Sequence, residues 1–255
     1  MRSRFLASVV VFATLPLFAQ QPAGQAPKPK SQKEVEALQK VQAAAQSGNY
    51  DAEIQAINYV LENFADTEYK PMLLNMAVDA AQGKGDYAQT VAFGDQAIET
   101  DPNNIIARVT VAESVAQHAR ENDLDKDQSL KKVRDYANKA LDLLKAADTP
   151  PAGIPADRWP EVRKQLTGQA YDALGLAAGL DKKYPESVDD LKIAVTNDPS
   201  PVVEAHLAKA YVDNKQYDDA IAAADKVLAA NDAPAIVKQF ARQEKDAATR
   251  MKGAK

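Results

Sequence analysis

The side chains that most often carry enzymatic chemistry are few in this sequence. It contains two histidines, His118 and His206, and no cysteine. Neither a thiol nucleophile nor a clustered zinc site can be assembled from this set. Each histidine stands alone in a stretch with helical spacing, and such a residue is usually packed or on the surface. Histidine and cysteine chemistry is therefore not expected here.

Carboxylates are abundant, but their placement indicates a structural use. Asp189 with Asp190, and Asp218 with Asp219, lie near the starts of two expected helices, where negative charge favours the helix dipole. The ten glycines are scattered, and they form neither a phosphate-binding loop nor a GxSxG elbow. The sequence therefore predicts a protein that is not an enzyme and that needs no cofactor and no metal.

Composition and charge narrow the class further. The chain has 255 residues, of which 45% are hydrophobic but only 6% aromatic, while alanine recurs throughout. This composition favours helices with closely packed backbones over sheets and predicts an all-α fold. The formal net charge of -5, with acidic and basic residues interspersed, leaves no basic stripe for a phosphate backbone. Nucleic acid is not an expected partner.

The N-terminus has the pattern of an export signal. Arg2 and Arg4 precede an apolar run at 5–18, and Ala19 is a small residue at a plausible cleavage point. The alternative is an uncleaved anchor, but the run is shorter than the roughly 20 residues that cross a bilayer. We expect a signal peptide at 1–19, a flexible Pro- and Gln-rich linker at 20–31, and a periplasmic or secreted protein with no stable membrane anchor after cleavage.

Three segments of the remaining chain repeat one pattern. They are GKGDYAQTVAFGDQAIETDP, DKKYPESVDDLKIAVTNDP and NKQYDDAIAAADKVLAANDAP, around Tyr87, Tyr184 and Tyr217. In the first two, an alanine follows the tyrosine by ten residues and a proline by fifteen. A weaker copy, SGNYDAEIQAINYVLENF, places Tyr50 at the same point. Because Tyr184 and Tyr217 are 33 residues apart, the pattern predicts a repeating unit of about that length.

Each marker has a physical role in a pair of helices. The tyrosine begins the second helix and packs across the pair, and the alanine lets backbones approach closely. The Asp-Pro steps at Pro102 and Pro199 end their units, because proline cannot continue a helix. The pattern resembles tetratricopeptide repeats over most of residues 32–255. The resemblance implies an all-α, right-handed superhelical solenoid of antiparallel helix pairs, with about five repeats and a C-terminal capping helix. The alternative is an ordinary helical bundle.

The middle of the array departs from the pattern. Helices are expected at about 105–120 and from about 129, with an enlarged charged turn between them, and a longer helix is expected at about 157–180. Trp159 either pins the Pro-rich loop or covers part of a groove, and the first is the usual role of such a ring. The predicted boundaries are repeats at 32–148, a Pro-rich loop at 149–160, repeats at 161–233, and a capping helix and tail at 234–255.

The resemblance also implies a binding surface, because the first helices of stacked pairs line a concave side that can hold an extended peptide or a helix. Some family members clamp a C-terminal carboxylate with Lys, Asn and Arg, but Met72, Asn75, Asp79 and Ile106 occupy those positions here, so that pattern is not met. The mildly acidic lining favours a basic or apolar ligand segment. The predicted partner-binding residues are Asn75, Asp79, Gln82, Val109, Glu113, Gln117, Asp172, Leu176, Lys209 and Asp213.

Two functions remain open from the sequence. The first is an adaptor or scaffold in the cell envelope that binds a protein or peptide partner. The second is an accessory protein that binds a small molecule or glycan for an envelope enzyme. A closed apolar pocket would favour the second, and an open trough the first. The predicted residues could also be no more than solvated surface. We expect a monomer, because the C-terminal helix would cover the last apolar face.

Overall fold

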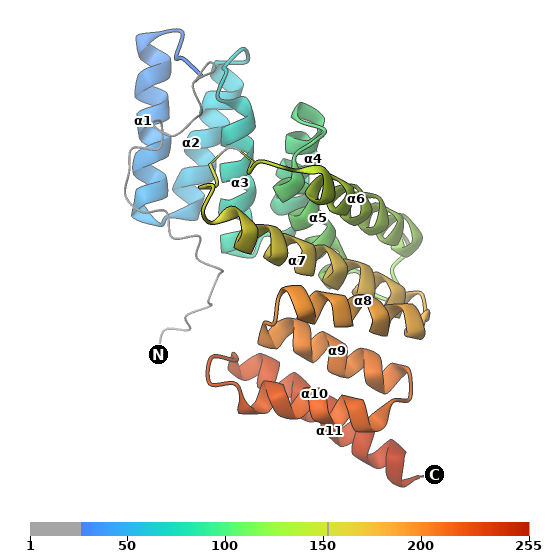
Figure 1. The fold of residues 1–255 in the computed structure, drawn as a ribbon. Coiled ribbons are helices and arrows are strands. Elements are labelled where there is room, and N and C mark those ends of the chain that lie inside the picture. Colours follow the sequence, from blue (N-terminus) through green and yellow to red (C-terminus); the bar gives the residue numbers. More distant parts are fainter. Residues whose placement is uncertain (1–26, 152, 255) are drawn as a thin grey trace. The chain divides into compact units, whose positions relative to one another are not determined.

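The computed structural model describes residues 27–151 and 153–254. These residues form eleven α-helices and no β-strand, and successive helices pair with each other (Figure 1). In the described part of the chain, no helix combines the length and apolar character needed to span a membrane. The helices are α1 Gln32–Ser47, α2 Tyr50–Asn63, α3 Lys70–Lys84, α4 Tyr87–Thr100, α5 Ile105–His118, α6 Lys126–Ala146, α7 Trp159–Leu180, α8 Tyr184–Asn197, α9 Pro201–Asp213, α10 Tyr217–Ala229 and α11 Ala235–Gly253.

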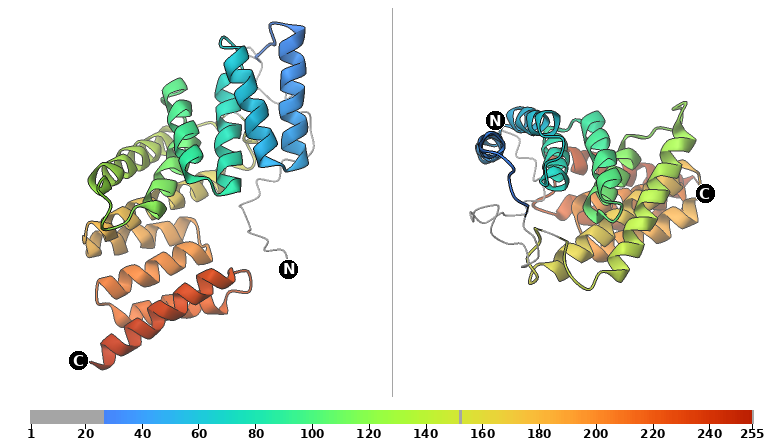
Figure 2. Two further views of the ribbon diagram at one scale, coloured as in Figure 1. Left: turned by 180° about the vertical axis from the view of Figure 1, so that it is seen from behind. Right: turned by 90° about the horizontal axis from the view of Figure 1, so that it is seen from above.

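The chain divides into two compact units. The first contains residues up to Val111 together with 149–155, and the second contains 112–148 and the residues from Ala156 onward. In the first unit, α1 packs on α2, α2 on α3 and α3 on α4. In the second, α6 packs on α7 and the order continues to α11, as the left-hand view of Figure 2 shows. The predicted all-α array of five pairs and a final helix is confirmed for the described residues.

The repeated tyrosines mark helix starts, as the sequence predicts. Tyr50, Tyr87, Tyr184 and Tyr217 are the first residues of α2, α4, α8 and α10. The Tyr50 ring also packs over Gly83 at the end of α3, where an added Cβ would lie 2.6 Å from a ring carbon. The helix ends predicted at the Asp-Pro steps are also confirmed, since α4 ends one residue before Asp101 and α8 ends one residue before Asp198.

The turn within each of these four pairs has one shared backbone feature. The residue two positions before the tyrosine has a positive φ, at Gly48, Gly85, Lys182 and Lys215. In the last three of these turns, the next N–H donates to a carbonyl five residues before it, which satisfies a group at the helix end. Glycine adopts this conformation without strain, whereas the two lysines adopt it at a cost of roughly 1 kcal/mol each.

The α7–α8 pair is packed most closely through glycine. A Cβ added at Gly175 would lie 2.6 Å from Cγ of Leu191, and one at Gly168 would lie 2.8 Å from the backbone nitrogen of Asp198. The hydroxyl of Ser187 donates to the carbonyl of Gly175 at 2.7 Å. The missing side chains let the two helix backbones approach, which is the role that small residues play in helix packing.

The start of α1 is fixed by a buried carboxylate. The Ser31 hydroxyl caps the helix by accepting from the Glu34 N–H at 3.1 Å, and Glu34 is only 1% exposed. The Glu34 carboxylate accepts from the Thr67 hydroxyl at 2.7 Å and from the Lys30 N–H at 2.6 Å. The chain before α1 and the α2–α3 loop are therefore tied together.

These contacts bear on the linker that the sequence predicts at 20–31. Within its described part, the Pro27 carbonyl accepts from the Tyr69 hydroxyl at 2.7 Å, and Lys30 pairs with Asp66 at 2.9 Å. Residues 27–31 thus contact the loop before α3, which differs from the free tether that the composition suggests. The rest of the linker and the signal peptide predicted at 1–19 lie outside the described residues.

Three helix bounds differ from the sequence prediction. Helix α6 begins at Lys126, not near 129, and α5 ends at His118, not near 120. Helix α7 begins at Trp159, inside the segment predicted as a Pro-rich loop, because Pro160 is compatible with the first turn of a helix. Trp159 is 6% exposed, so its ring packs in the interior at the start of α7 and does not form an open binding surface.

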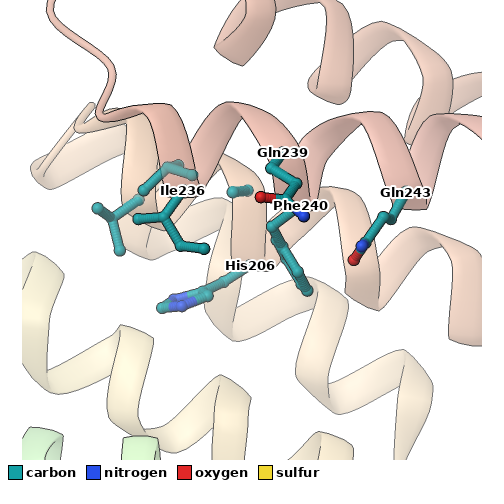
Figure 3. Close-up of a pocket in the computed structure, with 8 residues that line it drawn as sticks. His206, Ile236, Gln239, Phe240 and Gln243 are labelled. Carbon is teal, nitrogen blue, oxygen red and sulfur yellow. The ribbon is translucent and has the colours of Figure 1, made fainter.

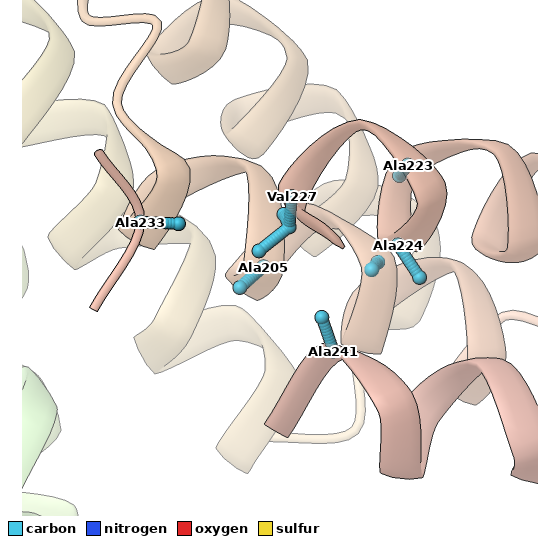
Figure 4. Close-up of a cluster of buried hydrophobic side chains, with 7 residues drawn as sticks. Ala205, Ala223, Ala224, Val227, Ala233 and Ala241 are labelled. Atoms are coloured by element: carbon cyan, nitrogen blue, oxygen red, sulfur yellow. The ribbon is translucent and has the colours of Figure 1, made fainter. Parts of the chain in front are cut away.

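The last helix closes the core of the second unit with alanines. Ala241 of α11 meets Ala205 of α9 and Ala223, Ala224 and Val227 of α10, and all five are buried (Figure 4). Small side chains allow close approach of the three helices. The polar remainder of α11 faces solvent, while Ile236, at its start, is 64% exposed.

Candidate functional site

Four ionisable side chains meet in the second unit. The Nδ1 atom of His206 on α9 is hydrogen-bonded to Oδ1 of Asp172 on α7, at 2.8 Å. Glu113 on α5 and Asp198, which follows α8, both interact electrostatically with Asp172. We call Glu113, Asp172, Asp198 and His206 the ionisable cluster. It contains three carboxyl groups and a single imidazole.

Burial and mutual repulsion change how the cluster titrates. Burial, and next the charge of Asp172, raise the pKa of Glu113 to about 7. The same two causes raise the pKa of Asp198. Burial alone would lower the pKa of His206, but the carboxylates of Asp172 and Glu113 outweigh it and raise that pKa. The cluster therefore binds protons near neutral pH.

An open apolar hollow adjoins the cluster. It lies between α9 and α11, has a volume of about 350 Å3, and shares His206 with the cluster. Figure 3 shows Ile236 and Phe240 of α11 on the side of the hollow that faces His206. The apolar hollow is lined by Val202, Ala205, His206, Ile236, Val237, Gln239, Phe240 and Gln243.

Comparison with known proteins gives matches in structure. No protein-family model and no curated protein sequence matches the chain. MamA of Desulfovibrio magneticus RS-1, from residue 41 to its end, matches with a TM-score of 0.56 and 18% identity, over 78% of this chain and 96% of that chain. A double mutant of MamA from RS-1 matches with a TM-score of 0.56 and 17% identity, over 86% of this chain and 99% of that chain. A thermophilic tetratricopeptide-repeat protein of Thermus thermophilus has a TM-score of 0.49 and 18% identity, over 83% and 98%.

The internal repeat is the deciding observation. Each of four pairs has a positive-φ turn residue two positions before the tyrosine that begins its second helix, and neighbouring pairs stack in order along each unit. The chain has the tetratricopeptide-repeat fold. In a tetratricopeptide-repeat array, α3, α5, α7 and α9 are first helices, which places the ionisable cluster on three of them and the loop before α9.

In the first unit, the predicted partner-binding residues have three different environments. Gln82 and Asp79 are exposed. Asn75 is half-buried and accepts a hydrogen bond from Asn104 at 2.7 Å. The prediction for Val109 is wrong, because it is 1% exposed and packs in the core. Val109 lies four residues before Glu113, so helical spacing places the two on a similar side of α5, but packing buries Val109 completely while Glu113 stays half-buried.

In the second unit, several predicted residues come together. Gln117 donates to Glu113 at 3.2 Å, and Leu176 is half-buried. Lys209 and Asp213 form an ion pair at 2.8 Å along α9. The prediction of Asp172 as an exposed contact residue is wrong, since its side chain is buried and held by His206. Its charge still acts on Glu113.

The sequence analysis did not predict some residues of the site. His206 stands alone in its own helix, but Asp172 lies 34 residues before it. Residues one repeat apart occupy matching positions on neighbouring tetratricopeptide repeats, so that spacing is a readable signal. Ile236 and Phe240 carry no such signal. Their place beside α9 depends on how α11 packs.

The cluster makes stability depend on pH. The folded chain holds the Glu113 proton more tightly than the unfolded chain does, so the free energy of unfolding falls as pH rises from about 4.5 to about 7. The raised pKa of His206 acts in the same direction, because its stabilising charge is lost at higher pH. Replacing Glu113 by Gln keeps the neutral form, and should stabilise the protein relative to wild type by about 1–2 kcal/mol at pH ~8 and little at pH ~5.

Urea unfolding at these two pH values, followed by circular dichroism, measures this difference. The exposed Asp142 of α6, changed to Asn, is the matched control and should leave the pH dependence as in wild type. An equal pH dependence in the Glu113→Gln variant and wild type would show that Glu113 is not the titrating group.

A second open hollow lies in the first unit. It has a volume of about 470 Å3 between α2 and α4, and Tyr59 on its edge is 51% exposed. The Oε1 atom of Gln89 in this hollow is buried and accepts no hydrogen bond from the residues that the structure describes. Across the described ranges, no group of three or more His, Asp or Glu side chains is arranged to hold a metal ion.

Proposed function

We propose that the chain is a non-enzymatic scaffold that binds a protein or peptide partner in the cell envelope. In this proposal the signal at 1–19 is cleaved near Ala19 after export, and the remaining chain acts as a monomer. The partner contacts the first helices of the second unit. The observation that carries the proposal is the ionisable cluster, formed by side chains of several repeats, beside an open apolar hollow between α9 and α11.

The chemistry of the surface supports a protein ligand. An apolar depression with charged groups at its edge is the usual composition of a peptide anchor site. Helical repeats also present such sites at regular spacing, so successive ligand residues can be bound along the array.

The small-molecule alternative is less well supported. Sites for small ligands usually enclose most of the ligand surface. The hollow at α9 and α11 and the hollow at α2 and α4 are both wide open to solvent. This openness fits a partner that covers the site from outside.

Affinity capture tests the proposal. The purified chain from Gln20 onward is incubated with an envelope fraction of the source organism, and the bound proteins are identified by mass spectrometry at low and at high salt. Wild type should retain a small reproducible set of proteins, and Glu113→Lys should lose them by about tenfold, because the charge of the site is reversed.

The control places the same charge change on another helix. Asp142 is exposed on α6, so Asp142→Lys should retain the same set of proteins as wild type. If wild type retains nothing above a bare resin, or if the two variants behave alike, the proposed binding surface is wrong.

A further inference from the structure

The apolar hollow leaves large side chains in water that α11 could have covered. Ile236 is 64% exposed and Val202 of α9 is 37% exposed, while Phe240 is only partly buried. On the same helix, Ala241 and Ala248 are buried completely. Helix α11 thus turns Ala241 and Ala248 to the core, while Ile236, Val237 and Phe240 line the hollow. Such residues gain free energy when a partner covers them.

Through His206, the hollow adjoins the carboxyl groups of the ionisable cluster. His206 is bonded to Asp172, and Glu113 is near enough to both to change their electrostatics. The cation of Lys209 is already paired with Asp213. The α11 side of the hollow contributes Gln239 and Gln243, which are neutral.

Of the two carboxyl groups that interact with His206, Glu113 is the one that can accept a new cation. Asp172 is buried and its Oδ1 atom is held by His206, whereas Glu113 is half-buried and is hydrogen-bonded to the neutral amide of Gln117. A cation that approaches Glu113 would also offset its repulsion with Asp172 and Asp198.

We propose that the apolar hollow binds one large aliphatic or aromatic side chain of a partner peptide, and that a nearby Lys or Arg of the peptide pairs with Glu113. This inference rests on the proposed function and names the chemistry of its ligand. The hollow has the volume of roughly twelve water molecules, at about 30 Å3 each, which suits one large side chain with adjoining backbone.

A second copy of this chain is a less suitable occupant. Beyond the hollow, the exposed face of α11 carries Arg242, Asp246 and Arg250, and this mixed charge does not offer a continuous apolar surface for self-association. The charge of the cluster selects instead for a ligand with a positive group beside its apolar one.

Binding of this ligand depends on pH in a stated direction. As pH rises from about 6 to about 8, Glu113 loses its proton, because its pKa is about 7, and the site becomes more negative. Affinity for a cationic peptide should therefore increase with pH. The groups that face Glu113 are Asp172 from α7, His206 from α9 and Asp198 from the loop before α9.

A synthetic hexapeptide library tests the proposal directly. Its second and fifth positions, separated by two alanines, are varied over all residue types, and binding to the full chain is measured by fluorescence anisotropy. Peptides that combine Leu, Ile, Met or Phe with Lys or Arg should bind best. Preference for acidic peptides, or the absence of any binding peptide, would overturn the proposal.

Variants of the protein locate the bound peptide. Ile236→Asn should weaken the best peptide by about tenfold, since it removes apolar contact from the hollow. Met251→Asn is the matched control, because Met251 is 48% exposed on the same helix away from the hollow, and it should change affinity by less than about twofold. Equal losses in the two variants would contradict the assigned site.

A double-mutant cycle isolates the ion pair. Replacing the Lys of the best peptide by Ala should cost about fivefold with wild type and almost nothing with Glu113→Gln. Wild-type affinity should also be higher at pH ~8 than at pH ~6, and this difference should shrink in the Glu113→Gln variant. If removing the peptide Lys costs the same affinity with wild type and with Glu113→Gln, the Lys does not pair with Glu113.

Two further outcomes separate this inference from the proposed function. If envelope proteins captured by wild type are retained by Ile236→Asn, the scaffold function stands and the hollow is not its site. If sedimentation shows a wild-type dimer that Ile236→Asn converts to monomer, the hollow binds a second copy and the peptide proposal is overturned.

Discussion

Replacing Gly175 by Val is expected to lower the free energy of unfolding of the second unit by about 2–3 kcal/mol. An added Cβ at Gly175 would lie 2.6 Å from Cγ of Leu191 and 3.2 Å from the carbonyl oxygen of Ser187. Leu191 is 1% exposed, so it has no free space into which to move. The α7–α8 pair must then separate or shift. Urea unfolding followed by circular dichroism measures the loss.

A second substitution tests whether crowding is the cause. Leu191→Ala alone should cost about 3 kcal/mol by leaving a cavity, but together with Gly175→Val the added methyl groups should partly fill that cavity. The double variant should therefore lose about 1–2 kcal/mol less than the sum of the single variants. Gly179→Ala is the control, because its new Cβ would meet only the Ser187 hydroxyl, at 3.3 Å. Strict additivity would refute the crowding explanation.

Replacing Glu34 by Ala is expected to destabilise the first unit by about 2–3 kcal/mol. The change removes the buried acceptor of the Thr67 hydroxyl and of the Lys30 N–H, and an unsatisfied buried donor costs about 1–3 kcal/mol. Hydrogen exchange of amides in α1, together with urea unfolding, measures the effect. Protection should fall first at the start of α1.

Two comparisons make this result specific. Glu36→Ala alters an exposed carboxylate on the same helix, and should change stability by less than about 0.5 kcal/mol. Glu34→Gln keeps a side-chain oxygen that can accept from the Thr67 hydroxyl, so this variant should lose less stability than Glu34→Ala. Equal effects of Glu34→Ala and Glu36→Ala would mean that the contact between Glu34 and Thr67 does not stabilise the fold.

The fold could be predicted from the sequence because its markers act locally. A short polar turn followed by the tyrosine of the repeat marks a helix start, and an Asp-Pro step marks a helix end. The structure has helix starts at Tyr50, Tyr87, Tyr184 and Tyr217. The bounds of α6 were less accurate. Its first turn contains Asp127 in place of a tyrosine, and a charged segment reads equally well as a turn or as a helix start.

The candidate site was predictable only in part. Glu113 and Gln117 follow from helical spacing, and the bond from Asp172 to His206 follows from the 34-residue interval once repeats are aligned. The burial of Val109 and the exposure of Ile236 could not be derived in this way. Both depend on the rotation of a helix about its own axis, which packing against neighbouring helices determines.

The positive-φ turns also explain how related arrays become hard to recognise. The same backbone is formed with glycine at residues 48 and 85 and with lysine at 182 and 215. Lys182 gains an ion pair with Glu121, at 2.6 Å, which helps to offset the strain of its conformation. Repeat units that exchange glycine for lysine at this position keep the same backbone conformation while the sequence identity between them falls. Structural similarity between such units therefore remains detectable after their sequence similarity has been lost.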